Sequence, residues 1–304
     1  MSEFSIEQLK SFLDTIGLRY VVFGDTNRVC SGPSSLSDTS DKSVTFVRSV
    51  SIQRDFLIGL RGIVLCPPQL LDSNLENAIS VGDLTKIEID DTELVFYLIL
   101  NHFFSEKLPE GIHESSCVES GAVIGEGVTI GANSFVASSV NLEYGVRIGS
   151  NCTLRNCTVG AETTIQDGVR IGDEALGAVQ KKNGEWVDRQ SFGRVNIGRN
   201  VRIESNTVIN RGFLADTILE NNIRIGANCS IGNGVQIGEG TLIALGVVIC
   251  GSVSIGSNAR IWGNSSMREG VQIGNEAVVG LGSVVLNDVR DGEVHVGNPS
   301  RRLK

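Results

Sequence analysis

Features that would mark a secreted or membrane protein are missing from this sequence of 304 residues. No apolar run approaches the roughly 18 residues that a membrane-spanning helix needs. The N-terminal stretch MSEFSIEQLKSFLDTIG has neither the basic start nor the cleavage site of a signal peptide. We therefore expect a cytoplasmic protein with no membrane span.

Clustered cysteines and an excess of positive charge are also missing. The seven cysteines are scattered and form no CxxC pair, so we expect reduced thiols rather than a disulfide framework, and no metal site. The formal charge of −9 argues against nucleic acid or an anionic membrane as the main partner. Aromatic residues make up only 5% of the chain, so a core must consist mainly of Ile, Val and Leu.

Glycine, in contrast, is abundant, with 36 residues, and it accompanies an aliphatic residue at a fixed spacing. An apolar side chain stands at every sixth position from Val118 to Leu154 and again, without a break, from Leu219 to Val285. A helix has a period of 3.6 residues and a simple strand a period of 2, so a period of six fits neither. It predicts a short strand followed by a sharp corner, repeated as the coils of a parallel β-helix.

A second inward position follows from the same repeat. The fourth residue after each aliphatic one is usually small, as at Ser134, Cys152, Cys229 and Ala259. A small side chain suits the interior of a narrow tube, and a free cysteine behaves as a small hydrophobe. We therefore expect Cys152 and Cys229 to be packing residues.

The composition changes near residue 105. The preceding part shows helical spacing over residues 5–16 and 92–104 and short strand-like runs at 20–23, 44–47 and 63–66. This pattern indicates a small α/β domain, a candidate for nucleotide or sugar binding. The predicted order along the chain is an α/β domain at 1–104, a linker at 105–117, a β-helix at 118–290 and a C-terminal tail at 291–304.

Two interruptions break the repeat, at residues 173–195 and 210–217. The first contains Asn183-Gly184 between extended flanks, which predicts a hairpin with a two-residue turn. Loops on an otherwise regular scaffold are candidate functional positions, although they are also compatible with surface insertions.

The hexads resemble those of the left-handed β-helix acyltransferases. The order of the pieces is similar to that of the lipid A pathway N-acyltransferases that act on UDP-3-O-acylglucosamine. A small α/β domain is followed by IGDEALGAVQKKNGEWV, FGRVNIGRNVRIESNTVINRGFLADTILENNIRIGANCSIG and ICGSVSIG. The resemblance implies a homotrimer with active sites in clefts between neighbouring β-helices. It also implies an acyl thioester donor and a nucleotide-linked amino sugar as acceptor.

The chain departs from that family at several site positions. The family's catalytic histidine falls at Asn233, in the hexad IGNGVQ, and a second histidine falls at or beside Gly270. The acidic residue of its TIDRG-like motif falls at Asn210. The family stacks uracil between two aromatic residues. The first is kept here as Phe46, and the second is replaced by Ile52. The family's C-terminal helices, which engage acyl carrier protein, are missing, and the ending GNPSRRLK is similar to the tail of coenzyme A-dependent sugar acetyltransferases.

Amide formation requires a neutral amine to attack a thioester carbonyl, and a base helps by removing the proton. The three histidines, His102, His113 and His295, lie outside the repeats, so the usual histidine base is absent. An asparagine cannot take the proton, but it can orient the amine through a hydrogen bond. The predicted catalytic residues are Asn233, which orients the amine, and Asp216, which accepts the proton, with Glu204 or the leaving thiolate as the alternative acceptors.

The remaining candidates are binding residues. Arg211 could meet a phosphate of a nucleotide sugar or pair with an acidic residue. The two arginines near the C-terminus could meet the phosphates of coenzyme A or be solvated in a frayed tail. The predicted substrate-binding residues are Phe46, Asn210, Arg211, Asp173 and Glu174. The predicted donor-binding residues are Gly251, Arg301 and Arg302.

Taken together, these features predict a mainly β protein, a left-handed parallel β-helix of hexapeptide repeats preceded by a small α/β domain. We expect it to move an acyl group to the amine of a nucleotide-linked amino sugar in surface polysaccharide or lipopolysaccharide biosynthesis. The expected co-substrate is a coenzyme A thioester, with acyl carrier protein as the other donor, and no cofactor is expected to be bound permanently. Two alternatives remain open: O-acylation of a sugar hydroxyl, and a β-helix without catalysis that binds or supports a partner.

Overall fold

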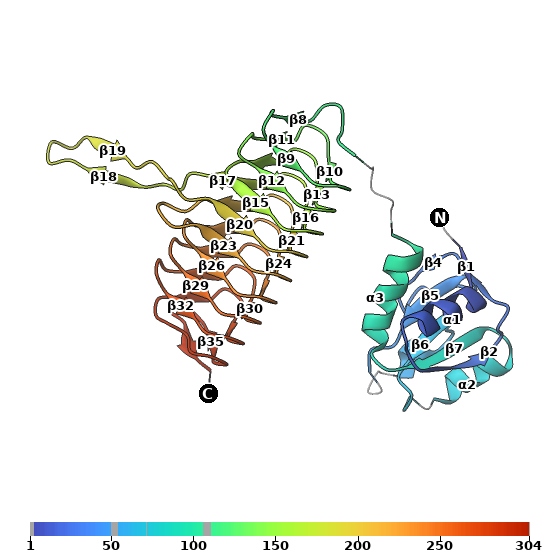
Figure 1. The fold of residues 1–304 in the computed structure, drawn as a ribbon. Coiled ribbons are helices and arrows are strands. Elements are labelled where there is room, and N and C mark those ends of the chain that lie inside the picture. The colour runs from blue at the N-terminus through green and yellow to red at the C-terminus, as the bar shows by residue number, and fades with distance from the viewer. Residues whose placement is uncertain (1–2, 50–53, 71, 106–110, 304) are drawn as a thin grey trace. The chain divides into compact units, whose positions relative to one another are not determined.

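The computed structural model describes residues 3–49, 54–70, 72–105 and 111–303 and divides into two compact units, residues 1–108 and 109–304 (Figure 1). The predicted fold class is confirmed, because an α/β unit precedes a mainly β unit of repeated coils. The departure at Ile52 lies outside the described residues. Within the part of the chain that is described, no helix is long and apolar enough to cross a membrane.

The first unit is built on a five-stranded sheet in the order β2-β7-β6-β5-β4, in which only the β2–β7 pair is antiparallel. The strands of this sheet are β2 (Tyr20–Gly24), β7 (Leu84–Ile89), β6 (Gly62–Cys66), β5 (Ser43–Phe46) and β4 (Gly32–Pro33). A separate antiparallel pair is formed by β1 (Phe4–Ser5) and β3 (Val29–Cys30). The helices are α1 (Ile6–Thr15), η1 (Arg54–Leu57), α2 (Ser73–Ser80) and α3 (Thr92–Phe103).

Two apolar clusters hold this unit together, one on each face of the sheet. Helices α1 and α3 pack on one face, where Leu9 and Ile99 meet Ile63 of β6. Helix α2 packs on the other face, where Leu75 meets Val64 of the same strand. Helix α1 starts at a capping box in which Ser5 and Gln8 exchange side-chain and backbone hydrogen bonds, which satisfies two of the N–H groups at its first turn.

The second unit is a β-helix whose coils stack as three sheets, which are parallel except for the antiparallel last pair of the ten-stranded sheet (Figure 1). The ten-stranded sheet contains β10 (Thr129–Ile130), β13 (Arg147–Ile148), β16 (Thr164–Ile165), β21 (Arg202–Ile203), β24 (Arg224–Ile225), β27 (Leu242–Ile243), β30 (Arg260–Ile261), β33 (Val278–Val279), β35 (Val294–Val296) and β36 (Arg301–Arg302). The nine-stranded sheet contains β8 (Cys117–Val118), β11 (Phe135–Val136), β14 (Thr153–Leu154), β17 (Arg170–Asp173), β22 (Val208–Asn210), β25 (Ser230–Ile231), β28 (Val248–Ile249), β31 (Ser266–Met267) and β34 (Val284–Val285). The eight-stranded sheet contains β9 (Val123–Ile124), β12 (Asn141–Leu142), β15 (Cys157–Val159), β20 (Val195–Ile197), β23 (Thr217–Leu219), β26 (Gln236–Ile237), β29 (Ser254–Ile255) and β32 (Gln272–Ile273).

The six-residue period produces this stacking. Each strand pairs with the strand three hexads later, so that Ile231 lies beside Ile249 and each aliphatic side chain covers the next inside the tube. Residues in the left-handed region turn the chain at the corners, for example Asn228 at a φ of 58° and Gly234 at a φ of 67°. The second inward position is confirmed, since Cys152 and Cys229 are buried among the aliphatic residues.

The first interruption forms a hairpin of β18 (Ala178–Gln180) and β19 (Trp186–Asp188) that projects from the coils (Figure 1). The hairpin is as expected, but the two-residue turn is wrong. The N–H of Lys181 donates to the carbonyl of Glu185, which leaves three residues in the turn, and only Gly184 of the Asn-Gly pair has positive φ. A type I′ turn would require positive φ at both residues, so a longer turn is formed instead.

The ends of the β-helix also differ from expectation. Gly111 is the first described residue after 105, and its carbonyl accepts from the N–H of Ile130, so residues 111–117 belong to the first coil rather than to the linker predicted over 105–117. At the other end, the tail predicted over 291–304 contains β35 and β36, which extend the ten-stranded sheet. In both places the extra chain pairs backbone groups that the outermost coils would otherwise leave open.

Candidate functional site

The corner between β25 and β26 carries Asn233. Its carbonyl oxygen accepts a hydrogen bond of 2.8 Å from the N–H of Ser252 in the next coil. Its side-chain oxygen lies over Gly251 of that coil, where a Cβ would come within 2.9 Å of it. Among the described residues the Asn233 amide group makes no side-chain hydrogen bond, and the residue is only partly buried. Asn233 therefore presents a free donor and acceptor at this corner.

A buried threonine ties this corner to the second interruption. The hydroxyl of Thr217 donates to the carbonyl of Asn210 at 2.8 Å and accepts from the N–H of Gly234 at 2.9 Å. Thr217 is itself fully buried. A single side chain thus links the carbonyl of Asn210 to the N–H of Gly234, the residue that follows Asn233.

Asp216 lies one residue before that threonine and is partly buried. One carboxylate oxygen accepts from the N–H of Arg194 at 2.7 Å, and the other accepts from Nδ2 of Asn196 at 2.8 Å. Each oxygen has a second lone pair available, so the group can still accept a proton or a further hydrogen bond. The arrangement fixes the 210–217 loop against the start of β20.

Four predicted binding residues meet where β17 pairs with β22. Nδ2 of Asn210 donates to the carbonyls of Asp173 and Glu174, at 3.4 Å and 3.2 Å. The carboxylate of Glu174 pairs with Arg211 at 2.5 Å, and this hydrogen bond is the main reason that the pKa of Glu174 lies below its ordinary value. The carboxylate of Asp173 turns instead to Arg170, at 2.6 Å. The resulting cluster adjoins the corner of Asn233.

The predicted residues at the C-terminus lie apart from this cluster. Arg301 and Arg302 are exposed on β36, at the end of the ten-stranded sheet, whereas the Asn233 corner joins the nine- and eight-stranded sheets. Arg302 lies 3.4 Å from Glu293, and Arg301 donates to the carbonyl of its neighbour Ser300. Their role in donor binding stays a prediction.

Phe46 belongs to the other unit, where it lines a hollow of about 370 Å³ together with Ser34, Leu36 and Arg48. Its ring packs against Phe96, with 4.8 Å between the ring centroids. The hydroxyl oxygen of Ser34 is buried and has no hydrogen-bond partner among the described residues. The hollow thus combines an aromatic face, an unused hydroxyl and the guanidinium of Arg48, which is paired with Glu93.

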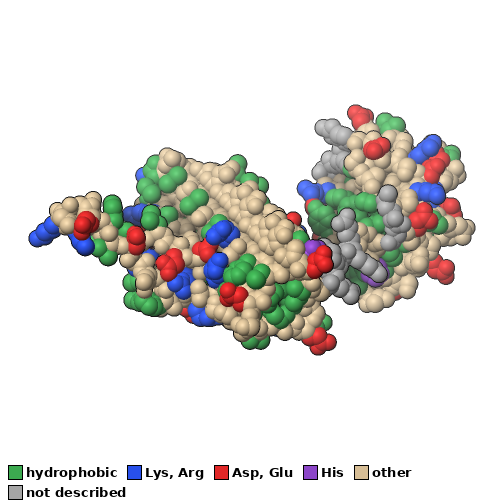
Figure 2. Space-filling view, turned by 90° about the horizontal axis from the view of Figure 1, so that it is seen from above, with side chains coloured by type: hydrophobic (Ala, Val, Ile, Leu, Met, Phe, Trp, Pro, Cys, Tyr) green, Lys and Arg blue, Asp and Glu red, His purple; other side chains and the backbone are tan. Residues whose placement is uncertain are grey.

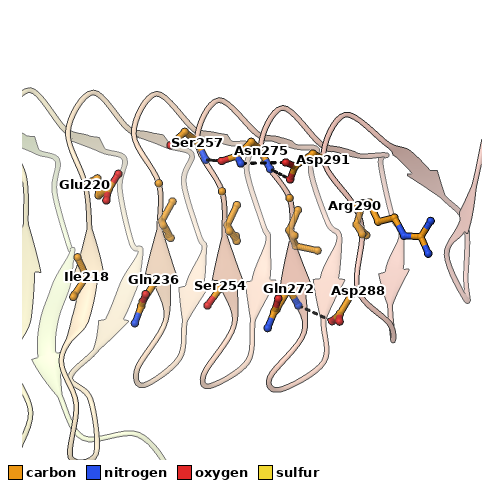
Figure 3. A pocket seen from close by; sticks show the side chains of 17 residues that line it. Ile218, Glu220, Gln236, Ser254, Ser257, Gln272, Asn275, Asp288, Arg290 and Asp291 are labelled. Atoms are coloured by element: carbon orange, nitrogen blue, oxygen red, sulfur yellow. Dashed lines mark hydrogen bonds between the residues drawn. The ribbon is translucent and has the colours of Figure 1, made fainter.

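A shallow groove of about 900 Å³ runs along the outer face of the eight-stranded sheet (Figure 3). Gln236, Ser254 and Gln272 point outward from successive strands, and Asp288 closes one end by accepting from the N–H of Gln272. The six-residue period predicts only the side chains that point into the tube, so the sequence did not predict this groove on its outer face. The polar residues directly before Ile237, Ile255 and Ile273 were the signal that could have found it.

No group of His, Cys, Asp and Glu that could hold a metal occurs among the residues that the structure describes. All seven cysteines are free thiols.

Comparisons with protein families match the repeats in two places. A model described as GlmU-like, C-terminal hexapeptide, matches residues 109–182. A model described as hexapeptide repeat of succinyl-transferase matches residues 216–250 and 252–287.

Similar curated proteins share one name, UDP-3-O-acylglucosamine N-acyltransferase. The protein from Pseudomonas savastanoi pv. phaseolicola is 30% identical over 263 residues, which cover 75% of this chain and 68% of the relative. The protein from Pseudomonas syringae pv. tomato is 28% identical, with 73% of this chain and 66% of the relative covered. The protein from Coxiella burnetii strain Dugway is 29% identical, with 60% and 58% covered. The chain thus matches only about three fifths to two thirds of the length of the last two relatives.

Two solved structures share the fold of the coils. UDP-N-acetylglucosamine acyltransferase from Campylobacter jejuni gives a TM-score of 0.57 at 22% identity, covering 64% of this chain and 74% of that one. LpxA from Acinetobacter baumannii gives 0.58 at 22% identity, covering 63% and 73%.

Proposed function

This chain belongs to the family of UDP-3-O-acylglucosamine N-acyltransferases, and we propose that it transfers an acyl group from a thioester to the amine of a nucleotide-linked amino sugar. The observation that carries the proposal is the free side-chain amide of Asn233 beside Gly251, at a corner to which Thr217 ties Asn210. A sugar amine held there would face a polar group that has no other partner among the described residues.

In the proposed mechanism Asn233 orients the acceptor amine through a hydrogen bond to its side-chain oxygen. Orientation alone supplies a large share of the catalytic effect, because an amine is already a fair nucleophile once it is neutral and aligned. The attack forms the C–N bond of the amide and expels the donor as a thiolate. The amine proton passes to Asp216 or to the departing thiolate, because no histidine occurs in the sequence between His113 and His295.

The hollow that contains Phe46 is the proposed nucleotide site. An aromatic face suits stacking of a base, and the unpaired hydroxyl of Ser34 and the guanidinium of Arg48 suit its polar edge or a phosphate. This assignment is supported by the relatives, whose name identifies a UDP-linked sugar as what they act on.

Coenzyme A is the proposed donor carrier, with acyl carrier protein as the alternative. The proposed assembly is a homotrimer. Support comes from the apolar side chains on the projecting hairpin and the loop beside it, where Leu176, Phe192 and Leu214 are 95%, 70% and 71% exposed. Figure 2 shows apolar side chains on this arm between basic and acidic ones. Apolar groups of this size are usually covered by a partner.

The proposal is tested by incubating the protein with a panel of nucleotide-linked amino sugars and with acyl groups on coenzyme A or on acyl carrier protein. Mass spectrometry would detect the acylated sugar. Formation of an amide with one pair supports the proposal, and the absence of product with every pair contradicts it. Replacing the amino sugar by its hydroxyl counterpart separates N- from O-acylation. A protein that binds neither carrier nor nucleotide by calorimetry would favour the non-catalytic alternative.

A further inference from the structure

Three buried polar atoms have no hydrogen-bond partner at the base of the projecting hairpin. They are Nε of Arg189, Oγ of Ser191 and Nε of Arg211, and no other part of the β-helix shows such an atom among the described residues. Ser191 is only 4% exposed, and the side chain of Arg211 is 18% exposed. Since buried donors in folded proteins are almost always satisfied, three orphans in one place indicate a missing acceptor.

The guanidinium of Arg189 is fixed in position between two surfaces. Its Cζ lies 4.3 Å from the ring centroid of Phe213, and a Cβ built on Gly177 would come within 2.5 Å of its Nε. The backbone N–H of Arg189 also donates to the carbonyl of Gly177 at 2.7 Å. The group is therefore a held cation, which can offer the N–H groups along its edge but cannot swing away.

One carboxylate lies near both guanidinium groups. Glu174 pairs with Arg211 at 2.5 Å and lies within electrostatic reach of Arg189 as well. It also accepts from the N–H of Ser191, at 3.4 Å. The neighbouring carboxylate of Asp173 is committed to Arg170. Among the described residues Arg189 has no ion pair of its own, so the guanidinium groups of Arg189 and Arg211 share the carboxylate of Glu174.

We propose that Arg189, Ser191 and Arg211 form a binding site for a phosphate group of the ligand. Two guanidinium groups and a hydroxyl, from two loops, suit a phosphate, because its oxygens accept hydrogen bonds from several directions and its charge matches two cations. A phosphate would also supply the ion pair that Arg189 lacks among the described residues. The site adjoins the candidate active site, because Arg211 directly follows Asn210 and its N–H donates to the carbonyl of Asp173.

The inference rests on the proposed function only for the source of the phosphate, which is either the diphosphate of a nucleotide sugar or the phosphates of coenzyme A. Pyrophosphate, UDP and coenzyme A are therefore the probes. Their binding is measured by calorimetry for the wild type, Arg189→Gln, Arg189→Lys and Ser191→Ala. Lys182→Gln, at the exposed tip of the hairpin, removes the same charge away from the site.

We expect Arg189→Gln to weaken pyrophosphate binding about ten- to a hundredfold, the scale of one charge-assisted hydrogen bond. Ser191→Ala should weaken it less, Arg189→Lys should restore part of it, and Lys182→Gln should leave it unchanged. Whichever of UDP and coenzyme A loses affinity in parallel is the source of the phosphate. Thermal unfolding of each variant establishes that the fold is kept.

Equal pyrophosphate binding by the wild type and Arg189→Gln, or no binding by the wild type, would overturn the inference. The acyl-transfer assay separates this result from the proposed function. If the protein transfers acyl groups but Arg189→Gln binds pyrophosphate as well as the wild type, the phosphate site is wrong and the proposed function stands. If Arg189→Gln weakens pyrophosphate binding but the protein transfers no acyl group, the phosphate site is supported and the proposed reaction is wrong.

Discussion

The side-chain oxygen of Asn233 lies so close to the Cα of Gly251 in the next coil that a Cβ at that glycine would approach it to 2.9 Å. The position of the amide thus depends on a residue three hexads away that has no side chain of its own. This dependence makes the role of Asn233 open to test from two directions.

Removal of the Asn233 side chain should slow acyl transfer without unfolding the protein. We expect Asn233→Ala to lower kcat about ten- to a hundredfold, the effect of one lost orienting contact. The thermal unfolding temperature should stay close to that of the wild type, because the amide makes no side-chain hydrogen bond among the described residues. An unchanged kcat would remove Asn233 from the site.

Gly251→Ala should reproduce that loss by pushing the amide aside. Because both substitutions disturb the same contact, the double variant should be no slower than either single variant. Gly282→Ala is the control for adding a Cβ at a corner, because Gly282 faces open space. Unlike Gly251, it has a positive φ, of 65°. That control should cost about 1 kcal/mol of stability and leave kcat unchanged. Additive losses in the double variant would show that Gly251 acts by another route.

Asp216→Asn should destabilise the protein, whatever its effect on the rate. The new NH₂ group would face either the N–H of Arg194 or Nδ2 of Asn196, and the loss of one acceptor should cost about 1–3 kcal/mol. Denaturant unfolding measures this cost, and Asn196→Ala in the same background should recover part of it. A variant as stable as the wild type would mean that these hydrogen bonds contribute nothing to stability.

The C-terminal end of the β-helix should weaken in acid. A hydrogen bond from His295 at 3.1 Å is the main reason that the pKa of Glu293 lies below its ordinary value of 4.5. A lowered pKa in the folded state means that the stabilisation is present above the unfolded-state pKa and is lost as the pH falls through the folded value. We expect the free energy of unfolding to decrease below about pH 4.5, and Glu293→Gln to flatten this decrease.

Denaturant unfolding between about pH 3 and pH 6 checks that expectation. Glu276 is a corner glutamate with no ion pair among the described residues. Glu276→Gln should therefore leave the decrease in the free energy of unfolding at low pH unchanged. Parallel curves for Glu293→Gln and the wild type would contradict the role of Glu293.

Thiol labelling should distinguish two of the seven cysteines. Cys117 and Cys250 are exposed, whereas the other five are buried. Burial raises the pKa of Cys66 and of Cys157 to about 12, so both stay protonated and unreactive at neutral pH. In the native protein an alkylating reagent should modify Cys117 and Cys250 rapidly, and all seven only after denaturation, as followed by mass spectrometry. Rapid labelling of Cys157 would show that the coils open.

The β-helix is predictable from the sequence because one rule repeats. Each aliphatic residue of the period turns inward, as Ile231 and Ile249 do, so a single pattern fixes the strands, the register and the core. The α/β unit offers no such redundancy. Strand β7 was not predicted, because Lys86 and Glu88 are typical of exposed positions. In the structure they form an ion pair of 2.7 Å, and only 8% and 16% of their side chains are exposed.

The candidate site shows the same division. Asn233 was found through the resemblance, because it occupies a motif position. Thr217, Arg189 and Ser191 were not found, since their importance arises from contacts between segments that lie in different coils or loops. Neither the composition nor the spacing of residues in a sequence shows which polar atoms lack a hydrogen-bond partner in the folded protein.

The register of the coils has a further consequence. Ile171 pairs with Ile209 although the whole projecting hairpin lies between them in the sequence, and the insertion disturbs the ladder only locally, by a register shift between Ile171 and Asp173. In such a scaffold the buried core of the coils and the inserted loops that carry the site can change independently. Its insertions can be lengthened, exchanged between relatives or redesigned one at a time, and a new specificity can arise without any change to the buried ladder that supports it.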